Sequence, residues 1–104
     1  MSDRLKQVVL AAIAGIGVTA ARVVLFGSQA RGDARVDSDM DILIVTREPL
    51  SNEIRMRLTK AVRSALAKLL IPADVLVMSH AEVEARRTVP GSIIRNAVRE
   101  GVAV

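Results

Sequence analysis

The chain has 104 residues, a net charge of +4 and no cysteine. Its length predicts one domain spanning residues 1–104, and the lack of cysteine excludes disulfides, thiolate zinc sites and cysteine nucleophiles. With a single histidine, any metal must be held by oxygen ligands. The positive charge favours anionic ligands, and an aromatic content of 1% leaves little of the stacking surface that single-stranded nucleic-acid binders use. We therefore expect a nucleotide ligand, and direct nucleic-acid binding is not expected.

Residues 8–26 form an almost continuous apolar stretch that approaches the length of a membrane span. Gly15, Gly17 and Arg22 interrupt it, which favours a buried helix followed by a buried strand. The first residues include Asp3 and lack the pattern of a signal peptide. We expect a cytoplasmic protein without membrane contact.

The first half of the chain predicts one helix and two strands, separated by polar turns. The expected elements are a helix capped by Ser2 or Asp3 and ending at about Ala14 before Gly15 and Gly17, a strand over Val23–Phe26, a short helical turn and loop over 28–38, and a strand over Met40–Thr46.

The second half predicts a long amphipathic helix, a third strand and further helices. The long helix is capped by Ser51 and ended by Pro72, and its apolar positions are Ile54, Leu58, Val62, Leu66 and Leu69/Leu70. A strand over 73–78 follows, and then a helix that is opened by the capping box Ser79-x-x-Glu82 and broken at Pro90. The last expected elements are a helix over 92–100 and an edge strand over 102–104. Met40, Met56 and Met78 are expected to fill the core, and His80 to have a helix-terminal role. The order predicts an α/β (α+β) fold with a small mixed β-sheet packed by helices.

Two carboxylates stand at the entrance to the second strand. Asp39 and Asp41 are two residues apart, so on a strand their side chains project from the same face. Hard oxygen ligands suit Mg²⁺, which is often bound by one or two carboxylates together with phosphates and water. Gly27 and Ser28 precede them, and a Gly-Ser turn allows the backbone to approach a phosphate closely.

Asp74 is the other acidic residue inside an apolar strand pattern. If its strand lies beside the second one, three carboxylates can hold two divalent ions about 3.5 to 4 Å apart, as in phosphoryl-transfer sites. Taken singly, Asp39 is equally compatible with a turn residue, and Asp74 with a cap or loop salt bridge. Together with the Gly-Ser turn, the three carboxylates favour a catalytic metal site.

The segment resembles the signature of the DNA polymerase β-like nucleotidyltransferase superfamily: Gly27-Ser28-x-Ala30-Arg31-Gly32-x-Ala34-x3-Ser38-Asp39-x-Asp41. In length and strand order the chain is most similar to the small stand-alone branch, the minimal nucleotidyltransferases. The resemblance implies that Asp39 and Asp41 bind metal, that Asp74 binds the catalytic metal and activates the acceptor, and that Gly27 and Ser28 hold the β- and γ-phosphates.

Many minimal nucleotidyltransferases resemble antitoxins paired with a HEPN-domain toxin. This implies transfer of AMP from ATP to a tyrosine of the toxin, which silences the toxin. Two alternatives remain open: a non-catalytic antitoxin that inhibits by steric binding, and an enzyme that modifies a small molecule. The base preference, the number of AMP units and the oligomeric state are not determined by the sequence.

Two further residues near the motif are candidates for nucleotide contact. Arg31 lies beside the Gly-Ser turn, and a guanidinium group can neutralise triphosphate charge or contact a partner. Ser38 is expected to orient the loop that carries Asp39 through local hydrogen bonds.

Overall fold

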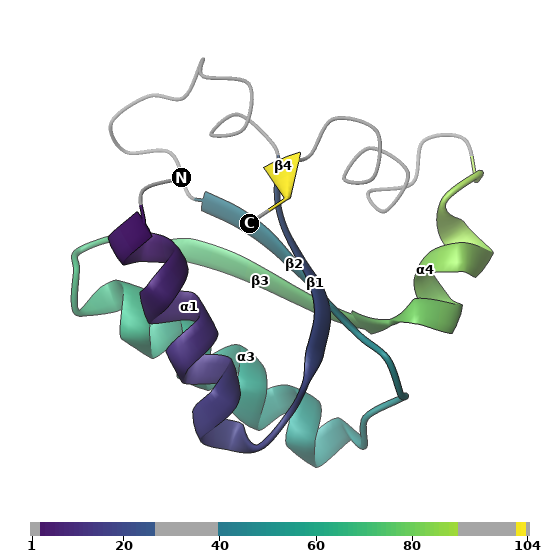
Figure 1. The fold of residues 1–104 in the computed structure, drawn as a ribbon, viewed down its shortest axis with the longest axis horizontal. Coiled ribbons are helices and arrows are strands. Elements are labelled where there is room, and N and C mark those ends of the chain that lie inside the picture. Colours follow the sequence, from purple (N-terminus) through teal and green to yellow (C-terminus); the bar gives the residue numbers. More distant parts are fainter. Residues whose placement is uncertain (1–2, 27–39, 90–101, 104) are drawn as a thin grey trace.

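The computed structural model describes residues 3–26, 40–89 and 102–103. Figure 1 shows their order along the chain: α1 (Asp3–Ile16), β1 (Ala20–Phe26), β2 (Met40–Thr46), α3 (Asn52–Ala67), β3 (Ala73–Ser79), α4 (His80–Arg86) and β4 (Val102–Ala103). None of the described helices has the length and apolarity needed to cross a membrane.

The strands form a mixed sheet in the order β3-β2-β1-β4. β1 pairs antiparallel with β2 and with β4, whereas β2 pairs parallel with β3. The parallel pair requires a crossover, and α3 provides it. The predicted small mixed sheet with packed helices is confirmed.

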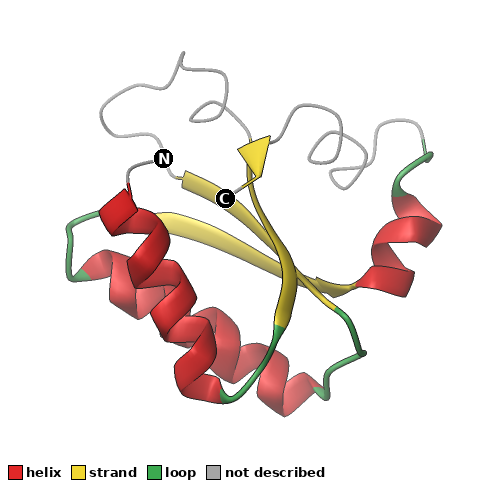
Figure 2. Cartoon of the chain, in the orientation of Figure 1, coloured by secondary structure: helices red, strands yellow, loops and turns green. Residues whose placement is uncertain are grey.

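Helices α1 and α3 lie together on one face of the sheet, and α4 lies at the other side of the molecule beside the end of β3 (Figure 2). The main core fills the space between the sheet and the α1–α3 layer. Its fully buried side chains include Val9, Ile42, Ile44, Leu58, Val62 and Leu66. These residues come from two helices and a strand, so burial of apolar area holds the two layers together.

A smaller apolar cluster lies on the opposite face, where α4 packs. It contains Val24, Leu43, Val45 and Val83. Because side chains alternate along a strand, β2 contributes Leu43 and Val45 to this face and its neighbouring residues to the main core. The sheet is therefore apolar on both faces, which explains the continuous apolar runs in the sequence.

The first helix and strand are each longer than predicted. α1 continues through Gly15 to Ile16, and Gly17, with φ +83°, provides the left-handed turn that ends it. The Gly17 N–H donates to the Ala14 carbonyl at 3.0 Å. β1 then begins at Ala20, where an irregularity in its pairing with β2 precedes Arg22.

Helix α3 begins as predicted and ends early. The Ser51 hydroxyl accepts a hydrogen bond from the Ile54 N–H at 3.2 Å, which confirms the cap. The helix stops at Ala67, before Pro72, because the chain must turn back to reach β3. Of the predicted pair Leu69/Leu70, Leu69 packs against the main core, whereas Leu70 lies in that turn with φ 60° and is 90% exposed. Met56 was wrongly predicted as a core filler, since it is 72% exposed.

The C-terminal region is described in part. The capping box Ser79-x-x-Glu82 is confirmed, but α4 ends at Arg86, ahead of the predicted break at Pro90. β4, over Val102–Ala103, confirms a strand at the sheet edge. The predicted turn over 28–38 and helix over 92–100 lie outside the described residues.

Candidate active site

The sheet brings two of the three predicted carboxylates together. In the parallel pairing of β2 with β3, Asp41 and Asp74 are register partners. Neighbouring strands lie about 4.8 Å apart, so the two backbones are adjacent at this point. The prediction that the strand of Asp74 lies beside the strand of Asp41 is confirmed.

Both carboxylates belong to the same face of the sheet. Asp41 alternates with Met40 and Ile42, which are in the main core, and it shares its face with Leu43. Asp74 shares its face with Leu76, which packs against the smaller cluster. The two carboxylates therefore stand on the face opposite α1 and α3.

The position along the strands keeps this pair accessible. Asp41 and Asp74 lie near the beginnings of β2 and β3, whereas α4 begins after the end of β3 (Figure 1). Asp41 is half-buried and Asp74 is exposed. A ligand can reach the carboxylates from this face without displacing a described helix.

The donor set suits a divalent cation. Two carboxylates from adjacent strands offer oxygen ligands only, which is the chemistry that Mg²⁺ prefers, with substrate phosphates and water completing its shell. No group of three metal-ligating side chains occurs within residues 3–26, 40–89 and 102–103. The predicted third ligand, Asp39, lies outside these residues, as do the predicted nucleotide-binding residues Gly27, Ser28, Arg31 and Ser38. Their roles stay predictions.

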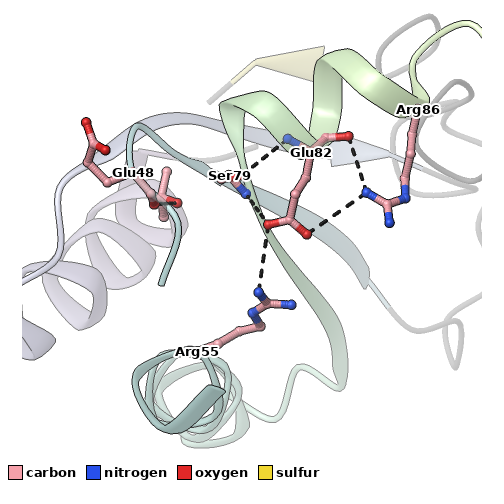
Figure 3. A network of polar contacts seen from close by, with 6 residues as sticks. Glu48, Arg55, Ser79, Glu82 and Arg86 are labelled. Atoms are coloured by element: carbon pink, nitrogen blue, oxygen red, sulfur yellow. Dashed lines mark hydrogen bonds and ion pairs between the residues drawn. The ribbon is translucent and has the colours of Figure 1, made fainter. Parts of the chain in front are cut away.

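The far end of β3 is fixed by a polar network centred on Glu82 (Figure 3). The Ser79 N–H donates to Glu82 Oε1 at 3.1 Å, and the Glu82 N–H donates to Ser79 Oγ at 3.2 Å. Arg55 on α3 lies 3.7 Å from the same carboxylate, and Arg86 lies 4.0 Å from it. The Ser79 N–H holds the pKa of Glu82 below its usual range, with further lowering from the Ser79 hydroxyl and the two arginines, partly offset by desolvation.

This network joins two elements that are far apart in sequence. The capping box was visible as Ser79-x-x-Glu82, but the ion pair from Arg55 was missed. No local signal predicts it, because Arg55 occupies one of several basic positions on α3. The contact anchors the end of β3 to α3 and so helps to hold the strand that carries Asp74 in place.

Comparison with known proteins agrees with this arrangement. The sequence profile of the nucleotidyltransferase domain family matches residues 10–104. The chain belongs to this family. The spectinomycin 9-adenylyltransferase of Campylobacter jejuni is 53% identical to this chain over 38 residues. These residues make up 36% of the chain but 15% of that enzyme, so most of the enzyme's length is not matched.

Solved nucleotidyltransferase structures share the fold. A protein assigned as a minimal nucleotidyltransferase is 28% identical, with a TM-score of 0.64, and the match covers 97% of this chain and 89% of that one. A toxin-antitoxin structure with AMP-PNP is 20% identical, with a TM-score of 0.64 over 94% of this chain and 70% of that one. The complex of a tri-AMPylated HEPN toxin with an MNT antitoxin from Shewanella oneidensis is 18% identical, with a TM-score of 0.62 over 99% and 71%. The predicted DNA polymerase β-like nucleotidyltransferase fold is confirmed.

Proposed function

We propose that this nucleotidyltransferase transfers AMP from ATP to a tyrosine hydroxyl of a HEPN-domain toxin and thereby neutralises the toxin. The catalytic part of this proposal rests on the register pairing of Asp41 with Asp74 on one accessible face of the sheet. The partner is supported by the fold that the chain shares with an MNT antitoxin solved in complex with a tri-AMPylated HEPN toxin. The reaction would take place in the cytoplasm, where ATP and Mg²⁺ are available.

In the proposed reaction the acceptor oxygen attacks the α-phosphorus of ATP. A new P–O bond forms to the acceptor, the bond between the α-phosphorus and the bridging oxygen to the β-phosphate breaks, and pyrophosphate leaves. Bound Mg²⁺, one ion or two, would neutralise charge on the triphosphate and make the acceptor oxygen more nucleophilic. Asp39, Asp41 and Asp74 would hold the metal.

The two described carboxylates have different surroundings, which suits different tasks. Asp41 is half-buried beside the apolar part of β2 and is suited to a fixed ligand position. Asp74 is exposed on the edge strand, where an acceptor from another molecule can approach. Its carboxylate would accept the proton of the acceptor hydroxyl as the new bond forms. Gly27 and Ser28 would hold the β- and γ-phosphates, with Arg31 neutralising their charge and Ser38 orienting the loop that carries Asp39.

The test measures transfer of label from ATP labelled in the α-phosphate to a HEPN-domain protein, and the product of any HEPN gene adjacent to this one is tried first. The variants Asp41→Asn and Asp74→Asn should each reduce the rate about 100-fold or more, because each removes a negative charge that would hold the metal, and Asp74→Asn also removes the proposed proton acceptor. Glu48→Gln is the matched control, since Glu48 is an exposed carboxylate just after β2 and lies outside the site. It should transfer at the wild-type rate.

Two other outcomes decide between the alternatives. If wild-type and the Asp41→Asn/Asp74→Asn variant neutralise the toxin equally and no label is transferred, the protein is a steric inhibitor. If label appears on spectinomycin or another aminocyclitol or aminoglycoside and not on protein, the acceptor is a small molecule, as the name of the Campylobacter jejuni relative would suggest.

A further inference from the structure

A basic groove runs along the flank of α3 and reaches the start of β3. Its volume is about 610 Å³. Arg55, Lys60 and Arg63 line it from the helix, and Ile71 and Pro72 line it from the connection to β3. None of the described residues that line the groove is acidic.

Two of its cations have no counterion among the described residues. Arg55 pairs with Glu82, but across residues 3–26, 40–89 and 102–103 neither Lys60 nor Arg63 forms an ion pair. Both side chains are exposed. Within the described part of the chain, the groove thus offers two positive charges without an ion-pair partner beside an apolar floor, a combination that favours a ligand with both anionic and apolar groups.

The groove also adjoins a sheet edge that can accept another strand. Among the described strands, β3 pairs with β2 alone and forms the edge of the sheet. The Met40 N–H donates to the Pro72 carbonyl at 3.0 Å, and a parallel ladder uses alternate residues of each strand. The backbone groups of Asp74 and Leu76 therefore point toward β2, and those of Val75 and Val77 point toward the other edge.

One exposed apolar side chain lines the groove, and a second lies in the adjoining turn, outside the lining. Met56 lines it and is 72% exposed. Leu70, next to Ile71 in the chain, is 90% exposed and adopts φ 60°, a conformation that is unfavourable for leucine. A large apolar side chain in a strained, solvent-exposed position does not stabilise the isolated fold. Its position is suited to contact with a partner.

We infer that this groove docks an extended acidic segment of the protein that presents the acceptor hydroxyl, with the segment lying along α3 and beside the free edge of β3. The helical flank from Arg55 to Ala67 is about 18 Å long at the usual rise of a helix, which matches five or six extended residues. Met56, Lys60 and Arg63 are spaced i, i+4 and i+7 and so share one flank of α3. Acidic side chains of the segment would meet Lys60 and Arg63, and its apolar side chains would meet Met56 and the apolar floor. The scarcity of aromatic residues in the sequence argues against RNA as the occupant.

The position of the groove connects docking with catalysis. Pro72 and Ala73 line its end, and Asp74 is the next residue along β3. A segment seated there would lie on the α3 side of the β3 edge, and a neighbouring part of the same protein would pass around that edge to bring its hydroxyl to Asp74 on the opposite face. The inference rests on the proposed function, because it takes the docked protein to be the one that supplies the acceptor hydroxyl.

The test uses a fluorescein-labelled decapeptide of alternating glutamate and valine, and measures its binding by fluorescence anisotropy. The variant Lys60→Glu/Arg63→Glu should weaken binding about tenfold or more, since two attractions become repulsions. The matched control, Arg57→Glu/Lys68→Glu, makes the same change in net charge at exposed positions that do not line the groove. It should bind within about threefold of wild-type. Equal loss in both variants would overturn the inference.

Two more measurements probe the occupant and its placement. The backbone amide NMR signals of Val75 and Val77 should shift when the peptide is added, with a smaller shift for Leu76; no shift at Val75 and Val77 would overturn the strand-like placement. A uridine decamer should bind more weakly than the peptide. If it binds more tightly and depends on Lys60 and Arg63, the groove is a nucleic-acid site and the inference is wrong.

Docking and catalysis can fail separately in these assays. The Asp41→Asn/Asp74→Asn variant should bind the peptide as wild-type does while transferring no AMP to the HEPN protein. Peptide binding in the groove without any transfer by wild-type protein would reject the proposed function alone. Transfer that is unchanged in Lys60→Glu/Arg63→Glu would reject the groove as the acceptor's docking site.

Discussion

Asp41 and Asp74 are register partners on the parallel strands β2 and β3, and they stand on the face of the sheet that α1 and α3 leave open. Like charges at directly opposed positions on neighbouring strands repel each other. A divalent cation between them would replace this repulsion with attraction of both carboxylates to the cation. If the pair holds the proposed metal, binding of that metal should therefore stabilise the protein.

The first prediction concerns this link. Saturating MgCl2 should raise the melting temperature of the wild-type protein, because a ligand at about 100 times its Kd stabilises the folded state by about 2.7 kcal/mol. The variant Asp74→Asn should be at least as stable as wild-type in EDTA, since it removes the repulsion, and should gain much less from Mg²⁺. Differential scanning calorimetry with and without EDTA measures both effects. Equal Mg²⁺ shifts in the two proteins would show that the cation binds elsewhere.

The second prediction concerns Glu82 and pH. The pKa of Glu82 is lowered in the folded state, first by the Ser79 N–H, so the unfolded chain takes up this proton at a higher pH than the folded protein does. The stabilisation is therefore complete above the ordinary glutamate pKa of about 4.3 and is lost as the pH falls through the folded value. Glu82→Gln should cost about 1 kcal/mol at neutral pH and much less in acid.

Glu84→Gln on the same helix is the control for that prediction. Glu84 pairs with Arg87 at 3.3 Å, but both side chains are 48% exposed. An exposed pair of this kind contributes little, so the substitution should change the free energy of unfolding by about 0.5 kcal/mol or less at either pH. Urea unfolding at neutral and acidic pH measures both variants. A pH-independent cost at Glu82 would mean that the side chain acts through packing and not through its charge.

The third prediction concerns the strained turn after α3. Leu70→Gly should raise the free energy of unfolding by about 1 kcal/mol, because glycine adopts a positive φ without steric cost and the leucine side chain is almost fully exposed. Leu70→Ala keeps the strain and should give no comparable gain. The midpoints of urea unfolding compare the three proteins. Destabilisation by glycine would instead indicate that the Leu70 side chain packs in solution.

The fourth prediction compares two apolar residues of α3. Leu58 is fully buried in the main core, and Leu58→Ala should cost about 2 to 5 kcal/mol. Met56→Ala, two residues earlier and largely exposed, should cost less than about 0.5 kcal/mol. Chemical denaturation of both variants tests the assignment of the core. Similar costs at the two positions would place Met56 inside the fold.

Much of the fold follows from local patterns in the sequence. Apolar periodicity predicted α1, β2, α3 and β3, and the capping signals at Ser51 and Ser79 marked where α3 and α4 begin. These features could be predicted because they depend on residues within one or two turns of each other. The end of α3 could not, because it depends on where the chain must turn to bring β3 beside β2. Leu70 is exposed because it falls in that turn, whereas its predicted alternative Leu69 packs on the core. Met56 was misplaced because hydrophobicity alone does not say which flank of a helix another element covers.

The sequence by itself determined the chemistry of the candidate site. The lack of cysteine and the single histidine leave oxygen ligands for any metal there, and the spacing of Asp39 and Asp41 favours a hard cation, because these follow from residue types and from the alternation of a strand. Only the tertiary structure decided that Asp74 is the register partner of Asp41, that Arg55 reaches Glu82, and that a basic groove ends beside the edge strand. Each of these relations joins residues distant in the chain, and strand order and helix packing, set by the whole core, bring them together.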